Sequence, residues 1–214
     1  MSTMRADAVR NRRLLIDAAA AEFAEHGMEV SITRIAARAG IGKGTVFRHF
    51  DSKEQLLAAI FSDRLEELVT TGLHLSLSGD PEAAFTEFMR AGVELHARDR
   101  SFCQAAAALS PSAPNVRASQ ERLAEVADIL VTRAQRVGAV REDITGVDIV
   151  LLQTAASQAI LGVGDAAPDL WERYLGVILD GLHPSPARPL RVASPTLEQF
   201  TGSPATFAQG ACAP

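Results

Sequence analysis

The residues best suited to chemistry lie in one short stretch, GIGKGTVFRHF, which begins at Gly40. Three glycines, a lysine and a threonine fall within its first six positions. Such residues can form a loop whose backbone N–H groups bind phosphate in an enzyme. They can equally form the turn and the start of a helix that contacts DNA. The flanking elements distinguish these two possibilities.

The phosphate-loop alternative does not fit the order of the residues. A dinucleotide-binding fingerprint needs its third glycine at the position of Thr45, and a P-loop needs serine or threonine after lysine, where Gly44 follows Lys43. Both motifs also follow a β-strand. The preceding residues, SITRIAARA, instead have the N-terminal serine and the apolar spacing of a helix.

A helix-turn-helix fits the same residues. Two helices that meet near a right angle need a short turn with a residue that tolerates positive φ, and Gly40 supplies it. Ala36 leaves room for the second helix to cross the first. The apolar residues around the turn are Ile35, Ala39, Ile41 and Val46.

The second helix of this pair has polar, basic or small residues at its start. In a helix-turn-helix, that part of the second helix contacts base edges in the major groove. The candidate DNA-binding residues here are Lys43, Gly44, Thr45, Phe47, Arg48 and His49.

The second class of protein to consider is an enzyme. No Ser/His/Asp motif is present, and the five histidines lack a metal-binding spacing such as His-Glu-x-x-His. His96, Asp99 and Cys103 lie close in sequence, but this spacing alone indicates no site. We therefore predict no catalytic residue, no metal site and no cofactor.

The composition is that of a helical globular protein. Apolar residues make up 47% of the chain, charged residues 22% and aromatic residues 5%, which favours helix over strand. The formal net charge is −5, yet basic residues gather near the N-terminus. Such a cluster can follow a phosphate backbone or can be an ordinary solvated surface. Its members are Arg5, Arg10, Arg12, Arg13, Arg34, Arg38, Lys43, Arg48 and Lys53.

No segment predicts export or membrane insertion. Asp17 and Glu22 interrupt the apolar residues that follow the basic start, at helical rather than signal-peptide spacing. The most apolar run, IVLLQTAASQAILGVG, is too short and too polar to span a bilayer. The two cysteines, Cys103 and Cys212, form no disulfide framework. These features predict a cytoplasmic protein.

Helical spacing recurs along the whole chain. A first helix carries an apolar stripe over residues 14–24 and ends at Gly27, and a second begins after Ser31. Asp51 and Glu54 have the spacing of a capping box that starts a fourth helix. The later helices are expected to begin at Pro81 and to cover residues 101–109, 116–137, 146–163 and 168–182.

These elements predict an all-α protein of about nine helices. Residues 1–58 would form a three-helix DNA-binding domain with a helix-turn-helix, and residues 59–183 a larger helical domain for ligand binding and dimerisation. Residues 184–214 are rich in proline, serine and alanine, which predicts a flexible tail.

Residues 12–57 resemble the DNA-binding domain of the TetR family of bacterial transcriptional regulators, of the TetR/AcrR-like kind. The resemblance rests on LLIDAAAAEFAEHG and SITRIAARAGIGKGTVFRHFDSKEQLL. RVGAVREDITGVDIVLL and WERYLGVILDGLHP are similar to late segments of many such regulators. The resemblance implies a homodimer that binds a DNA operator and is released by a small-molecule effector. It also implies pairing through residues 146–182, and the all-round apolar character of 146–163 independently favours this pairing.

The resemblance also implies roles for individual residues. Thr33 and Arg34 would lie near the DNA backbone, Lys53 would contact a phosphate, and His49 would lie near a phosphate or a base. Two positions depart from the family pattern. Phe47 replaces the usual tyrosine and so offers no hydroxyl to phosphate, and Gly42 replaces a common serine cap.

Aromatic and sulfur-containing side chains of the larger domain are candidates for the effector pocket. Each could instead be an ordinary core residue, and His96 could be a partly exposed histidine. The candidates are Phe85, Phe88, Met89, His96, Phe102, Trp171 and Tyr174.

The sequence therefore predicts a ligand-responsive DNA-binding regulator that represses from a palindromic operator. Two alternatives stay open: a TetR-like small-molecule-binding protein without sequence-specific DNA binding, and an all-helical enzyme.

Overall fold

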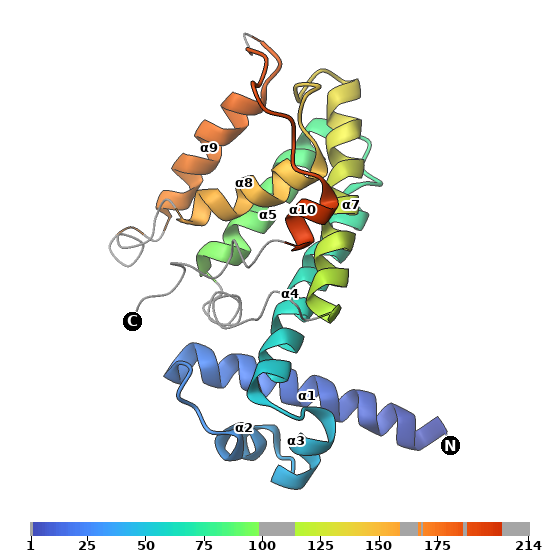
Figure 1. Ribbon diagram of the computed structural model, residues 1–214, viewed down its shortest axis with the longest axis vertical. Helices are drawn as coiled ribbons and strands as arrows, with labels where there is room; N and C mark the ends of the chain where they lie inside the picture. The colour runs from blue at the N-terminus through green and yellow to red at the C-terminus, as the bar shows by residue number, and fades with distance from the viewer. Residues whose placement is uncertain (1, 99–113, 159–166, 168, 186–187, 203–214) are drawn as a thin grey trace.

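The computed structural model describes residues 2–98, 114–158, 167, 169–185 and 188–202. These residues contain nine α-helices and no β-strand, which confirms the all-α prediction. The helix expected at 101–109 lies outside the described residues. Figure 1 shows the helices in two groups, a small head below and a larger body above.

The head consists of α1 (Ser2–His26), α2 (Ile32–Ala39) and α3 (Lys43–His49), and α4 (Lys53–Leu75) rises from it into the body (Figure 1). Its core is made of apolar side chains that recur at helical spacing along all four helices. Each large apolar side chain buried in this way contributes about 1.5–3 kcal/mol. The buried residues include Leu15, Ala19, Phe23, Ile35, Val46, Leu56 and Leu57.

The residues that begin and end the helices of the head are mostly those that the sequence indicates. Gly27 has a φ of 73° directly after α1, and the Ser31 side chain accepts a hydrogen bond from the Arg34 N–H at the start of α2. The cap of α4 differs from the expected Asp51–Glu54 pair. Ser52 is the N-cap and accepts from the Gln55 N–H, because the helix begins one residue later than the spacing suggested.

The body is built around α4 and α7 (Pro114–Arg136), which pack along each other. Their close approach depends on Gly72. A β-carbon at Gly72 would lie 2.5 Å from Cγ1 of Val126 on α7 and 2.8 Å from Cε2 of Phe88. Phe88 belongs to α5 (Pro81–Arg98), so one glycine allows three helices to meet.

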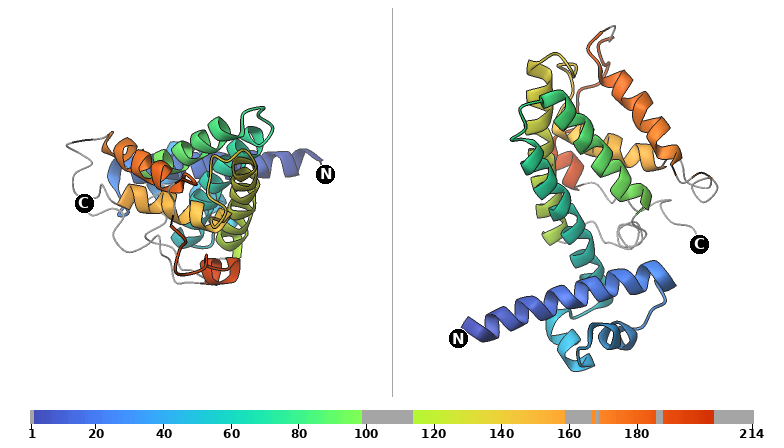
Figure 2. Two further views of the ribbon diagram at one scale, coloured as in Figure 1. Left: turned by 90° about the horizontal axis from the view of Figure 1, so that it is seen from above. Right: turned by 180° about the vertical axis from the view of Figure 1, so that it is seen from behind.

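The other side of the body is formed by α8 (Gly146–Gln158) and α9 (Leu170–Leu182). Both pack against α5, and α9 lies at the outer edge (Figure 2). Residue 168, where the last helix of this group was expected to begin, lies outside the described residues.

Part of the segment that was predicted as a flexible tail is a helix. Residues Leu197–Gly202 form α10, and Phe200 is buried where α10 packs against α7 (Figure 1). Thr196 and Gln199 cap this helix reciprocally: the Gln199 N–H donates to Oγ1 of Thr196, and the Thr196 N–H donates to Oε1 of Gln199. The sequence TLEQF contains this capping box followed by an aromatic anchor, a signal that composition alone obscured.

Candidate DNA-binding interface and effector-binding residues

The turn between α2 and α3 depends on Gly40. Gly40 has a φ of 66° and a ψ of 27°, and its N–H donates to the carbonyls of Ala36 and Ala37. The Ile41 N–H also donates to the Ala36 carbonyl at 3.0 Å. A residue with a β-carbon would be strained in this left-handed conformation. The predicted reason for glycine at this position is therefore confirmed.

The helix α3 buries one residue and leaves the others exposed or half-buried. Val46 points into the core at 1% exposure, whereas Lys43, Gly44 and Arg48 are exposed. Thr45 and His49 are half-buried. Phe47 is 46% exposed, so its ring is not a core residue in this chain. The candidate residues of α3 therefore form one accessible surface around a single anchoring valine.

Two cations of this surface, Lys43 and Arg48, have no hydrogen bond or ion pair with any other residue that the structure describes. No acidic residue lies in the first turn of α3. Their positive charges are thus available to an anionic partner, such as a phosphate, or to base edges.

The cations of α2 have partners within the head. Arg34 Nε lies 2.6 Å from Oε2 of Glu22 on α1, and Arg34 Nη2 lies 2.7 Å from Nε2 of His26. The first of these contacts is an ion pair without hydrogen-bond alignment, since Glu22 Oε2 accepts no bond from a described residue. The Glu22 side chain is only 6% exposed.

Arg38 continues this network one turn further along α2. Its Nη2 lies 2.7 Å from Oε1 of Glu25, and its Nη1 donates to Oε1 of Glu22 at 3.2 Å. The hydrogen bond to Glu25, and to a smaller extent the one to Glu22, raises the pKa of the Arg38 guanidinium. The bond between Arg38 and Glu25 also lowers the pKa of Glu25. Residue type and spacing did not predict this network. The acidic residues in the otherwise apolar stripe of α1 were its only signal.

Lys53, a predicted phosphate contact, lies at the start of α4 and is half-buried. Its ammonium donates to the Met28 carbonyl in the loop before α2 and lies 5.5 Å from the centre of the Phe23 ring. Thr33 is exposed on α2. The structure therefore brings Thr33, Arg34 and α3 to the surface, although Arg34 and the half-buried Lys53 already contact other residues of the head.

The N-terminal arginines also have partners within the chain. Arg13 lies 2.7 Å from Oδ1 of Asp63 on α4 and 3.3 Å from Oε1 of Glu67, so it links the head to the first part of the body. The Arg12 guanidinium lies 5.1 Å from the centre of the Phe50 ring. Burial raises the pKa of Asp63, and the Arg13 charge opposes that shift.

The candidate effector residues separate into a buried group and an exposed residue. Phe85, Phe88 and Met89 of α5 and Trp171 of α9 are buried in the core. Tyr174 is exposed on α9, and Phe102 lies outside the described residues. His96 is also buried, at 9% exposure, rather than partly exposed. Burial lowers the pKa of His96 to about 4, so the ring is neutral at physiological pH.

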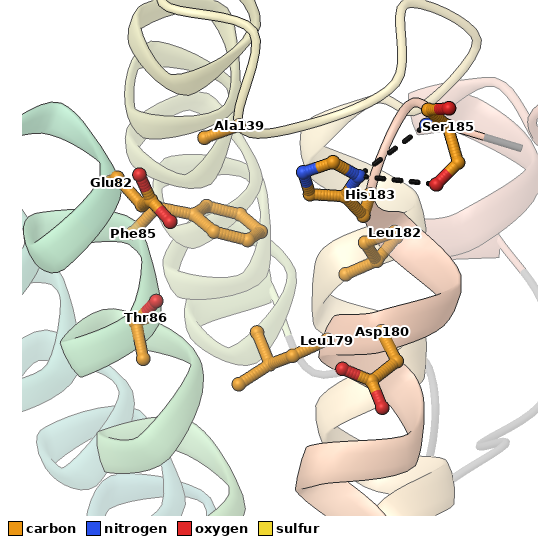
Figure 3. A pocket seen from close by; sticks show the side chains of 9 residues that line it. All are labelled: Glu82, Phe85, Thr86, Ala139, Leu179, Asp180, Leu182, His183 and Ser185. Atoms are coloured by element: carbon orange, nitrogen blue, oxygen red, sulfur yellow. Dashed lines mark hydrogen bonds between the residues drawn. The ribbon is translucent and has the colours of Figure 1, made fainter. Parts of the chain in front are cut away.

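A cavity of about 400 Å³ lies between α5 and α9. Figure 3 shows the Phe85 ring and the Leu179 side chain pointing into the space between the two helices. Two of the lining residues are hydrogen-bonded to each other, since the Ser185 N–H donates to Nδ1 of His183 at 3.4 Å. The lining residues are Glu82, Phe85, Thr86, Ala139, Leu179, Asp180, Leu182, His183 and Ser185.

Two family models match separate parts of the chain. Residues 15–60 match the model described as bacterial regulatory proteins of the tetR family. Residues 80–184 match the C-terminal domain of transcriptional regulators that are SbtR-like. The two matches correspond to the head and to the body.

A solved TetR transcription regulatory protein from Mycobacterium vanbaalenii is 33% identical, with a TM-score of 0.61. The likeness covers 84% of this chain and 99% of that one. The chain therefore belongs to the TetR family of bacterial transcriptional regulators. A structure of RolR in complex with resorcinol, with a TM-score of 0.60 at 23% identity, shares the fold.

Curated relatives match part of the chain. The probable acrEF/envCD operon repressor of Escherichia coli K12 is 31% identical over 97 residues, which are 44% of this chain and 44% of that repressor. A transcriptional regulator of Staphylococcus aureus is 40% identical over 68 residues, or 37% of its length. The match thus spans less than half of each curated relative.

The described residues contain neither a membrane span nor a metal-binding cluster. No helix among them is long and apolar enough to cross a membrane. No group of three or more His, Cys, Asp or Glu side chains among them could hold a metal ion. Asp99 and Cys103 lie outside that part of the chain.

Proposed function

We propose that this regulator is a cytoplasmic homodimeric repressor that binds a palindromic DNA operator through α3 and leaves it when a small molecule binds the body. The observation that carries the proposal is the surface of α3. Lys43 and Arg48, which form no ion pair with a described residue, flank the exposed Phe47 ring on a helix whose direction is set by the Gly40 turn. Cations and an apolar ring are the groups that read guanine and thymine edges in the major groove.

Within this proposal the DNA-contacting residues are those of the sequence prediction. Lys43, Gly44, Thr45, Phe47, Arg48 and His49 lie on or beside the exposed side of α3. Thr33, Arg34 and Lys53 would contact the backbone, and the last two would have to combine DNA contacts with their existing partners.

Dimerisation through residues 146–182 is supported by the outer side of α9. Val177 is 63% exposed there, close in sequence to the exposed Tyr174 and the half-buried Ile178. A cavity of about 360 Å³ between α8 and α9 is lined largely by leucine and isoleucine side chains, including Leu151, Leu152 and Ile178. A second copy would remove these apolar groups from water.

A small-molecule effector is supported by two relatives of the same fold. One was solved with resorcinol, and another is a gamma-butyrolactone receptor of the ArpA-like kind, 22% identical. An enzyme is not proposed, because both family models and the solved TetR relative are those of transcriptional regulators.

The proposal is tested by selecting bound duplexes from a random DNA pool with the wild-type chain and with Arg48→Ala. We expect an enriched inverted repeat that disappears in the variant. No enrichment at low salt would instead favour a TetR-like binding protein without sequence-specific DNA recognition.

A further inference from the structure

Three polar side chains lie inside the apolar core between α5 and α8. His96 comes from α5, and Gln153 and Thr154 come from α8. Gln153 is 0% exposed, so water does not reach its amide. A buried polar group lowers stability unless each of its polar atoms has a hydrogen-bond partner.

One polar atom of this group lacks such a partner. Gln153 Nε2 donates to the Phe88 carbonyl at 3.0 Å. Because a carbonyl can only accept, the amide must present its nitrogen there, and this fixes the direction of its oxygen. Gln153 Oε1 is buried and accepts no hydrogen bond from any residue that the structure describes.

The amide has space because α5 has a glycine beside it. A β-carbon at Gly92 would lie 2.2 Å from Gln153 Cδ and 2.5 Å from Oε1. The absence of a side chain at this position therefore lets the amide sit against α5.

The neighbouring histidine adds a second polar group without adding charge. His96 Nδ1 lies 2.8 Å from the Gly92 carbonyl, so this nitrogen carries the proton. Nε2 then faces Oγ1 of Thr154 at 3.4 Å. The low pKa of the buried ring keeps it neutral, and Phe88, Met89 and Val93 of the same helix are fully buried apolar residues.

Building on the proposed effector response, we propose that Gln153 Oε1 accepts a hydrogen bond from the effector, which is an uncharged molecule with an apolar body and a hydroxyl group. The hydroxyl supplies the donor that the buried oxygen does not find among the described residues. The apolar body matches the surrounding side chains. A charged ligand would lose its hydration without meeting an ion of opposite charge among the buried described residues of this group.

The class of ligand is tested with three matched probes: 4-ethylphenol, its methyl ether 4-ethylanisole, and 4-ethylbenzoate. The full chain is titrated with each, and binding is followed by calorimetry and by the fluorescence of Trp171. Trp171 is the one tryptophan of the chain, and it is buried in α9, which packs on α5 and α8. We expect the phenol to bind about tenfold more tightly than the ether, as one hydrogen bond allows, and the benzoate to bind weakest.

The role of Gln153 is tested by replacing it with an apolar residue of similar size. In Gln153→Leu, the phenol and the ether should bind equally, while the melting temperature stays the same or rises. Gln135→Leu is the matched control, because the Gln135 amide also donates to backbone carbonyls, those of Arg141 and Ile144, outside this group. The control should retain the preference for the phenol. Gly92→Ala should reduce that preference by displacing the amide.

Several results would overturn the proposal. These are tightest binding of the benzoate, no binding of the phenol at millimolar concentration, or a preference for the phenol that persists in Gln153→Leu. Operator binding by the same samples separates this failure from failure of the proposed function. A wild-type chain that selects an operator but ignores the phenol keeps the DNA-binding function and loses only the proposed effector class.

Discussion

The cations of α2 and those of α3 have different surroundings, although the two helices are joined by one short turn. On α2, Arg34 and Arg38 contact Glu22, and Arg38 also contacts Glu25. On α3, Lys43 and Arg48 have no ion pair with any described residue. The positive charge of α2 is therefore compensated by acidic residues of the head, and that of α3 is not compensated by any residue that the structure describes.

This difference indicates that the cations of α2 and those of α3 have different functions, although they look alike in the sequence. Glu22 is nearly buried in α1, so the arginines that reach it fix the position of α2 against α1. Because the Gly40 turn joins α2 to α3, the position of α2 also fixes that of α3. In this interpretation α2 positions α3, and α3 reads the DNA.

Among variants of the α2 ion pairs, Glu22→Ala should cause the largest loss of stability. The change removes the carboxylate that Arg34 and Arg38 share, and we expect a loss of about 2–3 kcal/mol, below the usual cost of breaking a fully buried pair because both arginines are partly exposed. For a chain of this size, each kcal/mol lowers the melting temperature by about 2–4 °C. Calorimetry measures the shift.

Glu25→Ala provides the matched control for that variant. Glu25 is an exposed acid that contacts Arg38 but not Arg34 at hydrogen-bond distance, and its loss should change the melting temperature much less. Equal shifts in the two variants would show that burial of Glu22 does not set the strength of the network.

The next largest effect is expected for Arg48→Ala, which removes a cation of α3. If Arg48 reads a base, operator affinity should fall by about 1–3 kcal/mol while the melting temperature stays unchanged. Arg34→Ala should show the opposite pattern, with a lower melting temperature and a smaller loss of operator affinity. Fluorescence anisotropy with a selected operator measures the affinities. A large affinity loss in Arg34→Ala at unchanged stability would break the comparison.

The sequence was sufficient to predict the helix-turn-helix, because that motif depends on local features. Gly40 needs a positive φ, Ser31 caps α2, and Val46 anchors α3, and each of these can be recognised from residue type and spacing. Which cations are free could not be predicted in this way. The partners of Arg34 lie in α1, so the pairing depends on tertiary packing.

The body shows the same division. Buried Phe88 and Trp171 follow from helical periodicity. The unpaired oxygen of Gln153 depends on how α5 and α8 pack, and on the missing side chain at Gly92. The polar residues in the apolar run of α8 had served only as an argument against a membrane span, although they were also the signal of a buried polar group.

Lys43→Ala distinguishes two uses of an unpaired cation. If Lys43 reads a base, operator affinity should fall by about 1–3 kcal/mol, and binding to random DNA should change little. Equal losses on both kinds of DNA would instead assign Lys43 to a phosphate. Anisotropy titrations with operator and scrambled duplexes at one salt concentration decide between these outcomes.

The smallest effect on DNA binding is expected for Lys53, which resembles both the paired cations of α2 and the cations of α3. Its ammonium donates to the Met28 carbonyl, but an ammonium has three donors, and the side chain is only half-buried. If the other donors reach a phosphate, Lys53→Ala should weaken binding to all sequences and lower the salt dependence of the affinity by about one unit of logarithmic slope. Titrations over a range of salt concentrations measure that slope. An unchanged slope with a lower melting temperature would place Lys53 with Arg34 and Arg38, among the cations that hold the head together.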